Sequence, residues 1–191
     1  EIREDGLPKV LKIHRKSLDR QYIEFSEPAF SCYLATNNNY FDTEFYYGYS
    51  SPKKPGSIFK ENIQSGKSDL VWQQSVSNYD ENLYEVERHK ILARDNTKVP
   101  VSLVYKKGIN LEKAPILVYG YGSYGIIIDA AFRTSILPLL NRGFIFAVAN
   151  IRGGSEMGRQ WYDDGKILNK KNTFYDSVSY THLRAHETEA D

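Results

Sequence analysis

The chain has 191 residues, and its 25 Lys and Arg residues against 24 Asp and Glu residues give a formal net charge of +1. Because no basic excess attracts polyanions, we expect neither a nucleic acid nor a membrane surface as a partner. Hydrophobic residues make up 41% of the chain, as in an ordinary globular protein, and no apolar run approaches the ~20 residues that a membrane span needs.

Residues 9–75 are a succession of short strand candidates separated by turn-forming residues. We predict strands at 10–14, 22–25, 31–35, 44–49, 57–61 and 70–73. The segments between them, such as 37–39 and 51–56, are rich in Asn, Pro, Ser and Gly. Turn signals at this short spacing indicate an antiparallel all-β region. Periodicity alone does not decide between a sandwich, a barrel and propeller blades.

The pattern of the chain changes after about residue 80. Residues 84–93 and 98–105 are typical of two strands around a turn at 94–97, which predicts a β-hairpin. Residues 116–119 and 144–151 are two further apolar runs, and each predicts a buried strand.

A helix is expected between these two apolar runs. Ser135 is the candidate N-cap of a helix that begins at Ile136, and Pro138 is tolerated because it falls in the first turn. Arg142-Gly143 is a typical C-terminal stop signal. A strand, a helix and a second buried strand form a parallel β-α-β unit, so we expect an α/β module after the all-β region.

The glycine-rich loop after the first apolar run contains a literal G-x-G-x-x-G at residues 120–125. A dinucleotide site needs a helix that starts at once and an acidic residue ~20 positions further on. Here the β-branched run 126–128 is poor for starting a helix, and after Asp129 the next acidic residue is Glu156. A dinucleotide-binding domain is therefore kept only as an alternative.

The same loop has two other interpretations. It is either a tight loop with packed aromatic rings or part of an oxyanion hole, which α/β-hydrolases place between the third strand and the helix that follows. Its glycines let the backbone approach a substrate closely, and its tyrosines offer hydroxyl donors.

Ser155 is the residue that most invites assignment as a nucleophile. A nucleophile elbow reads G-x-S-x-G, with a glycine two positions away on either side. Gly153 satisfies one side, but Met157 stands on the other, and no other Ser in the sequence meets the pattern. We therefore interpret Ser155 as part of a loop and expect His14 and His89, which lie in strand candidates, to be structural.

Residues 84–177 resemble the start of the peptidase domain in the prolyl oligopeptidase family of serine peptidases, most closely its oligopeptidase B branch. The matching blocks, in chain order, are 93–95, 98–105, 117–125, 142–144, 151–154, 158–162, 164–166 and 170–174. The all-β stretch 9–75 is similar to the last propeller blades of that family, with 22–25 and 27–29 as landmarks.

The resemblance implies a mixed fold. Residues 1–82 would be the C-terminal part of a β-propeller, contributing its last blade or blades, and residues 83–177 the incomplete N-terminal part of an α/β-hydrolase peptidase domain. The family implies a serine endopeptidase that hydrolyses short peptides by way of an acyl-enzyme. Its oligopeptidase B branch implies cleavage after Arg or Lys. We expect no cofactor and no metal.

The resemblance also assigns roles to residues of the glycine-rich loop. Tyr121 matches the family tyrosine whose hydroxyl donates to the oxyanion, and Tyr124 matches the aromatic residue beside the primary specificity pocket. The Ser, Asp and His of the catalytic triad lie downstream of the residues present. We therefore expect the chain as given to be inactive.

The family pattern ends after Asp176. Residues 178–188 resemble a translated sequencing adapter, so we expect 178–191 to be a non-native tail. His182 and His186, spaced like a helical metal pair, are then explained as read-through. The chain opens at Glu1 without an initiator methionine, and we expect the native N-terminus to lie upstream.

A second class of function stays open from the residues alone, namely a non-catalytic β-rich binding module. A single cysteine, Cys32, excludes a disulfide within the chain and favours a reducing compartment such as the cytoplasm. We expect Cys32 to be a small buried thiol.

Overall fold

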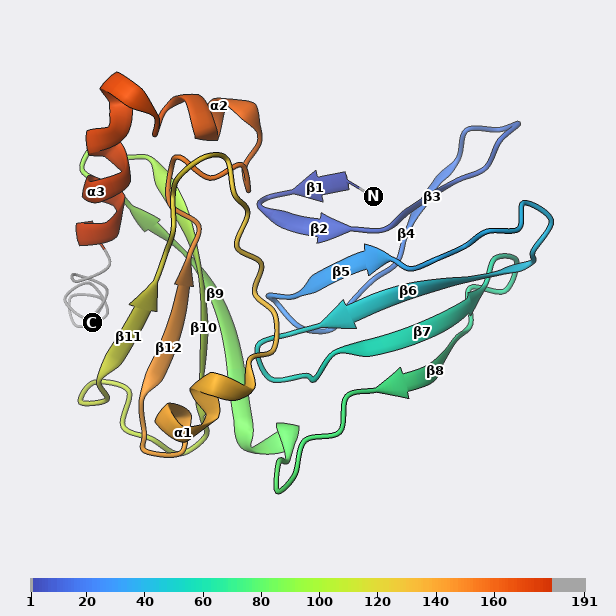
Figure 1. The fold of residues 1–191 in the computed structure, drawn as a ribbon, viewed down its shortest axis with the longest axis horizontal. Coiled ribbons are helices and arrows are strands. Elements are labelled where there is room, and N and C mark those ends of the chain that lie inside the picture. The colour runs from blue at the N-terminus through green and yellow to red at the C-terminus, as the bar shows by residue number, and fades with distance from the viewer. Residues whose placement is uncertain (1, 180–191) are drawn as a thin grey trace, which may run out of the picture.

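The computed structural model describes residues 2–179, and its N-terminal part consists of antiparallel strands (Figure 1). Two hairpins come first, formed by β1 Ile2–Glu4 with β2 Leu7–Lys9, and by β3 Leu11–Ile13 with β4 Arg20–Tyr22. A four-stranded sheet in the order β5-β6-β7-β8 follows, formed by Ser31–Leu34, Glu44–Ser50, Ser57–Asn62 and Ser68–Gln73. The predicted all-β region is confirmed, although the strand expected at 22–25 ends at Tyr22.

Aromatic side chains fill the core of this region. Its buried members are Val10, Ile23, Phe30, Cys32, Tyr47 and Tyr49. The Phe25 ring stacks on Tyr49 at 4.6 Å between centroids, and Tyr47 stacks on Phe59 at 5.5 Å. Such aromatic contacts suit a pleated, half-buried surface, which explains why tyrosine is abundant here. Cys32 is buried, as expected, and its thiol lies 3.3 Å from the Pro8 carbonyl oxygen.

A second four-stranded sheet follows a short 3₁₀ turn at Glu81–Leu83. Its strands are β9 Tyr84–Leu92, β10 Lys98–Lys106, β11 Ile116–Tyr119 and β12 Ile145–Ala149, in the spatial order β11-β12-β10-β9. The predicted hairpin is confirmed as the antiparallel β9–β10 pair, and the predicted parallel pair is confirmed as β11–β12. Because β12 also pairs antiparallel with β10, it lies between the hairpin and β11.

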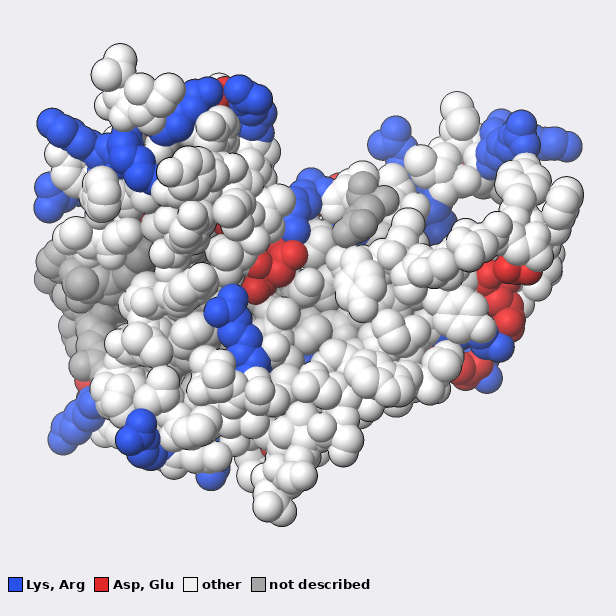
Figure 2. Space-filling model, viewed as in Figure 1, with Lys and Arg blue, Asp and Glu red and all other residues white. Residues whose placement is uncertain are grey.

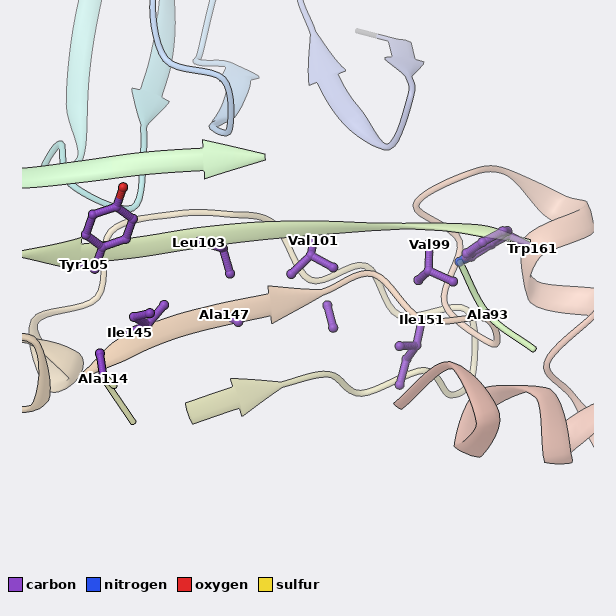
Figure 3. Packing of buried hydrophobic residues seen from close by; sticks show 11 residues of the cluster. Ala93, Val99, Val101, Leu103, Tyr105, Ala114, Ile145, Ala147, Ile151 and Trp161 are labelled. Carbon is purple, nitrogen blue, oxygen red and sulfur yellow. The ribbon is translucent and has the colours of Figure 1, made fainter. Parts of the chain in front are cut away.

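Alternating side chains of β10 and β12 build a core on each face of this sheet. On one face lie Val99, Val101, Leu103 and Tyr105 of β10 with Ile145, Ala147 and Ala149 of β12, and Trp161 packs at one end (Figure 3). On the other face Val104, Phe146 and Val148 pack with Ile136 and Leu140. The indole N–H of Trp161 donates to the Asn150 carbonyl at 3.0 Å, so Trp161 is a core residue with a satisfied donor.

The helix between β11 and β12 is shorter than predicted. A 3₁₀ turn at Thr134–Ile136 leads into α1, which covers only Leu137–Leu140. The prediction of Ser135 as N-cap is wrong, because Ser135 lies inside the 3₁₀ turn and the residue that caps α1 is Ile136, without a side-chain bond. Pro138 does fall in the first turn, and Gly143, at φ +83°, ends the segment as expected.

The prediction that 116–119 is a buried strand is also wrong. Leu117, Val118 and Tyr119 keep between 38% and 43% of their surface exposed. The reason is position, since β11 is the outer strand of its sheet and no other strand of the described part of the chain pairs with its free edge. Hydrophobicity alone does not distinguish an outer strand from a central one.

The C-terminal part of the described chain is helical. α2 covers Arg159–Asp163, a 3₁₀ turn covers Ile167–Asn169, and α3 covers Lys170–Ser179. The helix α3 therefore includes residues 178 and 179 of the predicted non-native tail. The remainder of that tail, with His182 and His186, lies outside the described residues.

The two β-rich parts of the molecule pack against each other. Ala29, which precedes β5, is fully buried in the core beneath α1, and the Phe132 amide donates to Ser50 Oγ at 3.0 Å. Arg3 of the first hairpin makes bonds of 2.8 and 2.9 Å to the two carboxylate oxygens of Asp129. Figure 2 shows the parts in contact below a notch at the top of that view.

We predict that the 191-residue chain is poorly stable by itself. β8 is exposed along its whole length and β11 offers an unpaired edge, so apolar surface and backbone hydrogen-bonding groups face water. Circular dichroism melting, with sedimentation to establish the oligomeric state, should show a broad, low-temperature transition. A single sharp transition from a monomer would contradict this expectation.

Candidate active site

The glycine-rich loop leaves the carboxyl end of β11 in a backbone conformation that few residues adopt. Gly122, Tyr124 and Gly125 have φ values of +58°, +56° and +67°. The Gly125 amide donates to the Gly153 carbonyl at 2.9 Å, and the Ile126 amide donates to the Ser123 carbonyl at 3.0 Å. A left-handed conformation is uncommon for a residue with a side chain. Tyr124 is therefore held in place by its surroundings and not by its own preference.

Gly122 of this loop, Gly153 and Gly165 come from three separate segments and pack in a row, backbone against backbone. A Cβ atom on Gly122 would lie 2.6 Å from Ile151 and Thr173, and one on Gly153 would lie 2.1 Å from the Gly122 carbonyl oxygen. A Cβ atom on Gly165 would lie 2.1 Å from the Gly153 amide nitrogen. No side chain fits at these distances. These contacts therefore fix the position of the loop relative to the segment after β12 and to α3.

A lysine from α3 reaches the same loop. Lys170 Nζ lies 2.6 Å from the Gly122 carbonyl oxygen and 2.6 Å from Ser123 Oγ. Burial lowers the pKa of Lys170, because an ammonium group loses hydration there. The loop between Tyr121 and Tyr124 is thus bonded to the first residue of α3.

The two tyrosines singled out in the sequence are both exposed to solvent. Tyr121 is 42% exposed and Tyr124 is 83% exposed. Tyr124 lines a surface pocket of about 220 Å³, together with Tyr162, Lys166 and Lys170. Neither ring is a core aromatic in the described chain, which leaves both side chains accessible to a substrate. Their roles in catalysis and specificity stay predictions.

Arg152 anchors the segment that follows β12. Its guanidinium bonds the buried Asp176 carboxylate at 2.6 and 3.0 Å and Asp95 at 2.6 Å, while its amide donates to Asp176 at 2.9 Å. Burial alone would lower the pKa of Arg152, but the bonds to the two carboxylates outweigh it and raise that pKa. The Arg152 partner in turn lowers the pKa of Asp95 to about 2. Helix α3, the β9–β10 turn and the Gly153 segment are thereby joined.

Glu156 is a buried acid next to this segment. Its Oε1 accepts the Ile128 amide at 3.0 Å, and its Oε2 has no hydrogen-bond partner within residues 2–179. Burial raises the pKa of Glu156, while hydrogen bonds from the Ile128 amide and other nearby donors, and the charge of Arg3, oppose the increase. The carboxyl group therefore holds its proton more tightly in the folded protein than in the unfolded chain.

We predict that Glu156→Gln stabilises the protein at neutral pH but not in acid. The raised folded pKa means that the stability contributed by the protonated acid is fully present below its ordinary pKa of 4.5. That contribution is lost as the pH rises through the folded value, whereas Gln does not titrate. Thermal midpoints of the complete protein should therefore differ more at about pH 8 than at about pH 4. Glu112→Gln, at an exposed site, is the control, and an equal difference at both pH values would refute the prediction.

The other sequence candidates do not assemble into a catalytic group. Ser155 lies in a tight turn, its carbonyl accepting the Gly158 amide at 3.0 Å. His14 bonds Ser17 and His89 bonds Glu87, and within residues 2–179 neither imidazole bonds Ser155. No helix begins directly after the glycine loop, as a dinucleotide site would require. No helix in residues 2–179 is long and apolar enough to cross a membrane.

Sequence reasoning missed three residues of this region: Lys170, Arg152 in its pairing with Asp176, and Glu156. Lys170 and Arg152 both lie in blocks that resemble the peptidase family, but a block does not say which side chain turns inward. Asp176 is 24 positions from Arg152, so only the fold brings the two together. For Glu156, the signal in the sequence was an acidic residue within a glycine-rich stretch.

Comparison with known proteins gives matches over both parts of the chain. The family model described as "Prolyl oligopeptidase, N-terminal beta-propeller domain" matches residues 1–74, and the model described as "Prolyl oligopeptidase family" matches residues 130–190.

Curated relatives extend the match over nearly the whole chain. "Dipeptidyl aminopeptidase BI" of Pseudoxanthomonas mexicana is 41% identical over 90% of this chain and 24% of its own length. "Protease 2" of Moraxella lacunata is 38% identical over 93% of this chain and 26% of its own length. The chain thus spans about a quarter of the length of these relatives.

Solved structures agree in fold. Oligopeptidase B from Leishmania major superposes with a TM-score of 0.85 at 34% identity, over 97% of this chain and 28% of that chain. Oligopeptidase B from Trypanosoma brucei, solved with covalently bound antipain, gives a TM-score of 0.85 at 37% identity, over 96% of this chain and 28% of that chain.

Proposed function

Because this chain belongs to the prolyl oligopeptidase family of serine peptidases, we propose that it forms part of an enzyme that hydrolyses short peptides. Its fold combines β-propeller strands with the start of an α/β-hydrolase domain. The observation that carries the proposal is the loop after β11, where an accessible tyrosine hydroxyl stands on a backbone locked by glycine contacts.

The proposed role of Tyr121 is to donate a hydrogen bond to the oxyanion. When a serine attacks a peptide carbonyl, negative charge develops on the carbonyl oxygen, and a donor already aimed at that position stabilises the transition state. The stacked glycines and the Lys170 bonds restrict movement of the loop, so little reorganisation is needed during the reaction. The nucleophile, its base and the orienting acid come from outside this chain.

The proposed preference is for cleavage after Arg or Lys. It is supported by the likeness to two oligopeptidases B at 34% and 37% identity. Tyr124 would lie beside the primary specificity pocket, where its ring packs against the aliphatic stem of a basic side chain. Proteins named prolyl endopeptidase are also similar, for instance that of Elizabethkingia meningoseptica at 35% identity, so proline specificity is the competing assignment.

We divide the chain into a propeller part at 1–82, a peptidase part at 83–177 and a non-native tail at 178–191. The first boundary lies in the 3₁₀ turn between β8 and β9. A cytoplasmic location is proposed on the single buried cysteine, which suits a reducing compartment.

The test compares the chain with the complete protein. The 191-residue chain should not release fluorophore from an Arg-containing peptide, because acyl transfer needs a nucleophile and its base. The complete protein, recovered by extending the gene past residue 177, should cleave Arg and Lys peptides in preference to matched Pro and Ala peptides. Turnover by the chain with fluorophosphonate labelling of Ser155 would overturn the first expectation, and a Pro preference would overturn the second.

A further inference from the structure

We propose that Lys170 is a positioning residue, which holds the glycine-rich loop so that the Tyr121 hydroxyl stays aligned with the substrate carbonyl. The inference rests on the oxyanion role proposed for Tyr121 and adds a second residue to it. Lys170 acts through the loop and not on the substrate.

The hydrogen bonds of Lys170 concentrate on one short segment, and its ammonium group also lies 6.0 Å from the centre of the Phe174 ring on the same helix. Its ammonium group bonds the Gly122 carbonyl oxygen and Ser123 Oγ, each at 2.6 Å. These acceptors belong to the two residues that directly follow Tyr121. Gly122 is in the left-handed conformation, and its Cβ position is blocked by Ile151 and Thr173. The bond therefore holds the loop at the point where its backbone turns.

The charge of Lys170 is not used in an ion pair. Among residues 2–179 it makes no salt bridge, whereas its neighbour in the same pocket, Lys166, pairs with Asp163. Figure 2 shows Lys and Arg side chains gathered over α2 and α3, so the positive charge of that surface does not depend on Lys170. A partly buried ammonium group is unfavourable unless its donors are satisfied. Here the loop oxygens satisfy two of them.

Helix α3, which carries Lys170, is itself held in place. Asp176 on the same helix bonds Arg152, and Thr173 Oγ1 bonds the Arg152 carbonyl at 2.7 Å and the Gly165 carbonyl at 3.1 Å. The helix cannot shift without breaking these buried contacts. Lys170 thus bonds the loop to a helix whose position is fixed by buried contacts.

The test is a double-mutant cycle in the complete protein with a fluorogenic Arg peptide. Lys170→Met should lower kcat by about 10- to 100-fold with little change in KM, since a misplaced donor weakens the transition state more than substrate binding. Lys171→Met, at the exposed neighbouring position, should be neutral. Lys170→Arg, which keeps charge and donors, should recover part of the loss.

The decisive measurement is made in a Tyr121→Phe background. If Lys170 acts by placing that hydroxyl, Lys170→Met should lower kcat there by less than about twofold, because interacting residues are not additive. Equal losses in both backgrounds, or a Lys170→Met enzyme as active as Lys171→Met, would overturn the inference alone. A neutral Tyr121→Phe would overturn the oxyanion role proposed for Tyr121 and the inference with it. Should Lys170→Met fail to fold by circular dichroism, Lys170→Gln takes its place in the cycle.

Discussion

Tyr121→Phe in the complete protein should lower kcat by about 10²–10³, equivalent to about 3–4 kcal/mol of transition-state stabilisation. The substitution removes one hydroxyl and keeps the ring. A donor on a restrained loop helps the charged transition state more than the neutral substrate, so kcat should fall and KM should change little. Steady-state kinetics on an Arg-containing peptide measure both constants.

The thermal stability of the Tyr121→Phe variant is the control for this substitution. Tyr121 is 42% exposed and is not a member of either core cluster of its sheet, so the free energy of unfolding should fall by no more than the loss of one hydrogen bond, ~1 kcal/mol. Wild-type kcat with an unchanged fold would eliminate the oxyanion assignment. Loss of kcat together with loss of fold would point to a packing role instead.

Arg152→Met should strongly destabilise the protein, by about 3–5 kcal/mol. It removes the partner of Asp176, whose side chain is fully buried, and leaves that carboxylate uncompensated. Amide hydrogen exchange in β12 and α3 of the complete protein should become roughly 10²–10⁴ times faster, as a free-energy change of this size implies.

Two companion variants separate charge from packing. Arg159→Met removes an arginine that is 77% exposed and pairs with Asp163 one helical turn away, and it should change stability by only ~0.3–0.5 kcal/mol. Arg152→Met/Asp176→Asn should recover part of the loss, because no buried charge remains. If the single and double variants were equally unstable, the uncompensated carboxylate would not be the cause.

The sequence was informative wherever structure follows from neighbouring residues. The β9–β10 hairpin follows from two strand patterns around a four-residue turn, and the strands β5 to β8 follow from regular turn signals. The assignment of Tyr121 and Tyr124 came from resemblance alone, and it stays a prediction because an accessible side chain on a restrained loop supports the role without testing it.

Properties that depend on distant contacts were not predictable. The outer position of β11 results from β12 pairing with β10, which no local pattern reveals. The pairing of Arg152 with Asp176 likewise joins segments 24 positions apart in sequence. Lys170 was visible only as one of two adjacent lysines, and the fold decides which of them turns inward.

The packing of Ala29 in the core beneath α1 limits how this protein can be recombined with its relatives. A chimera joined between β8 and β9 would respect the proposed boundary in sequence. It would, however, pack the peptidase part of another protein against Ala29, Ser50 and Arg3. Exchange of the propeller part must therefore carry matching residues at Phe132 and Asp129 on the other side. The two parts are separable along the chain, but their contact surfaces must be exchanged together.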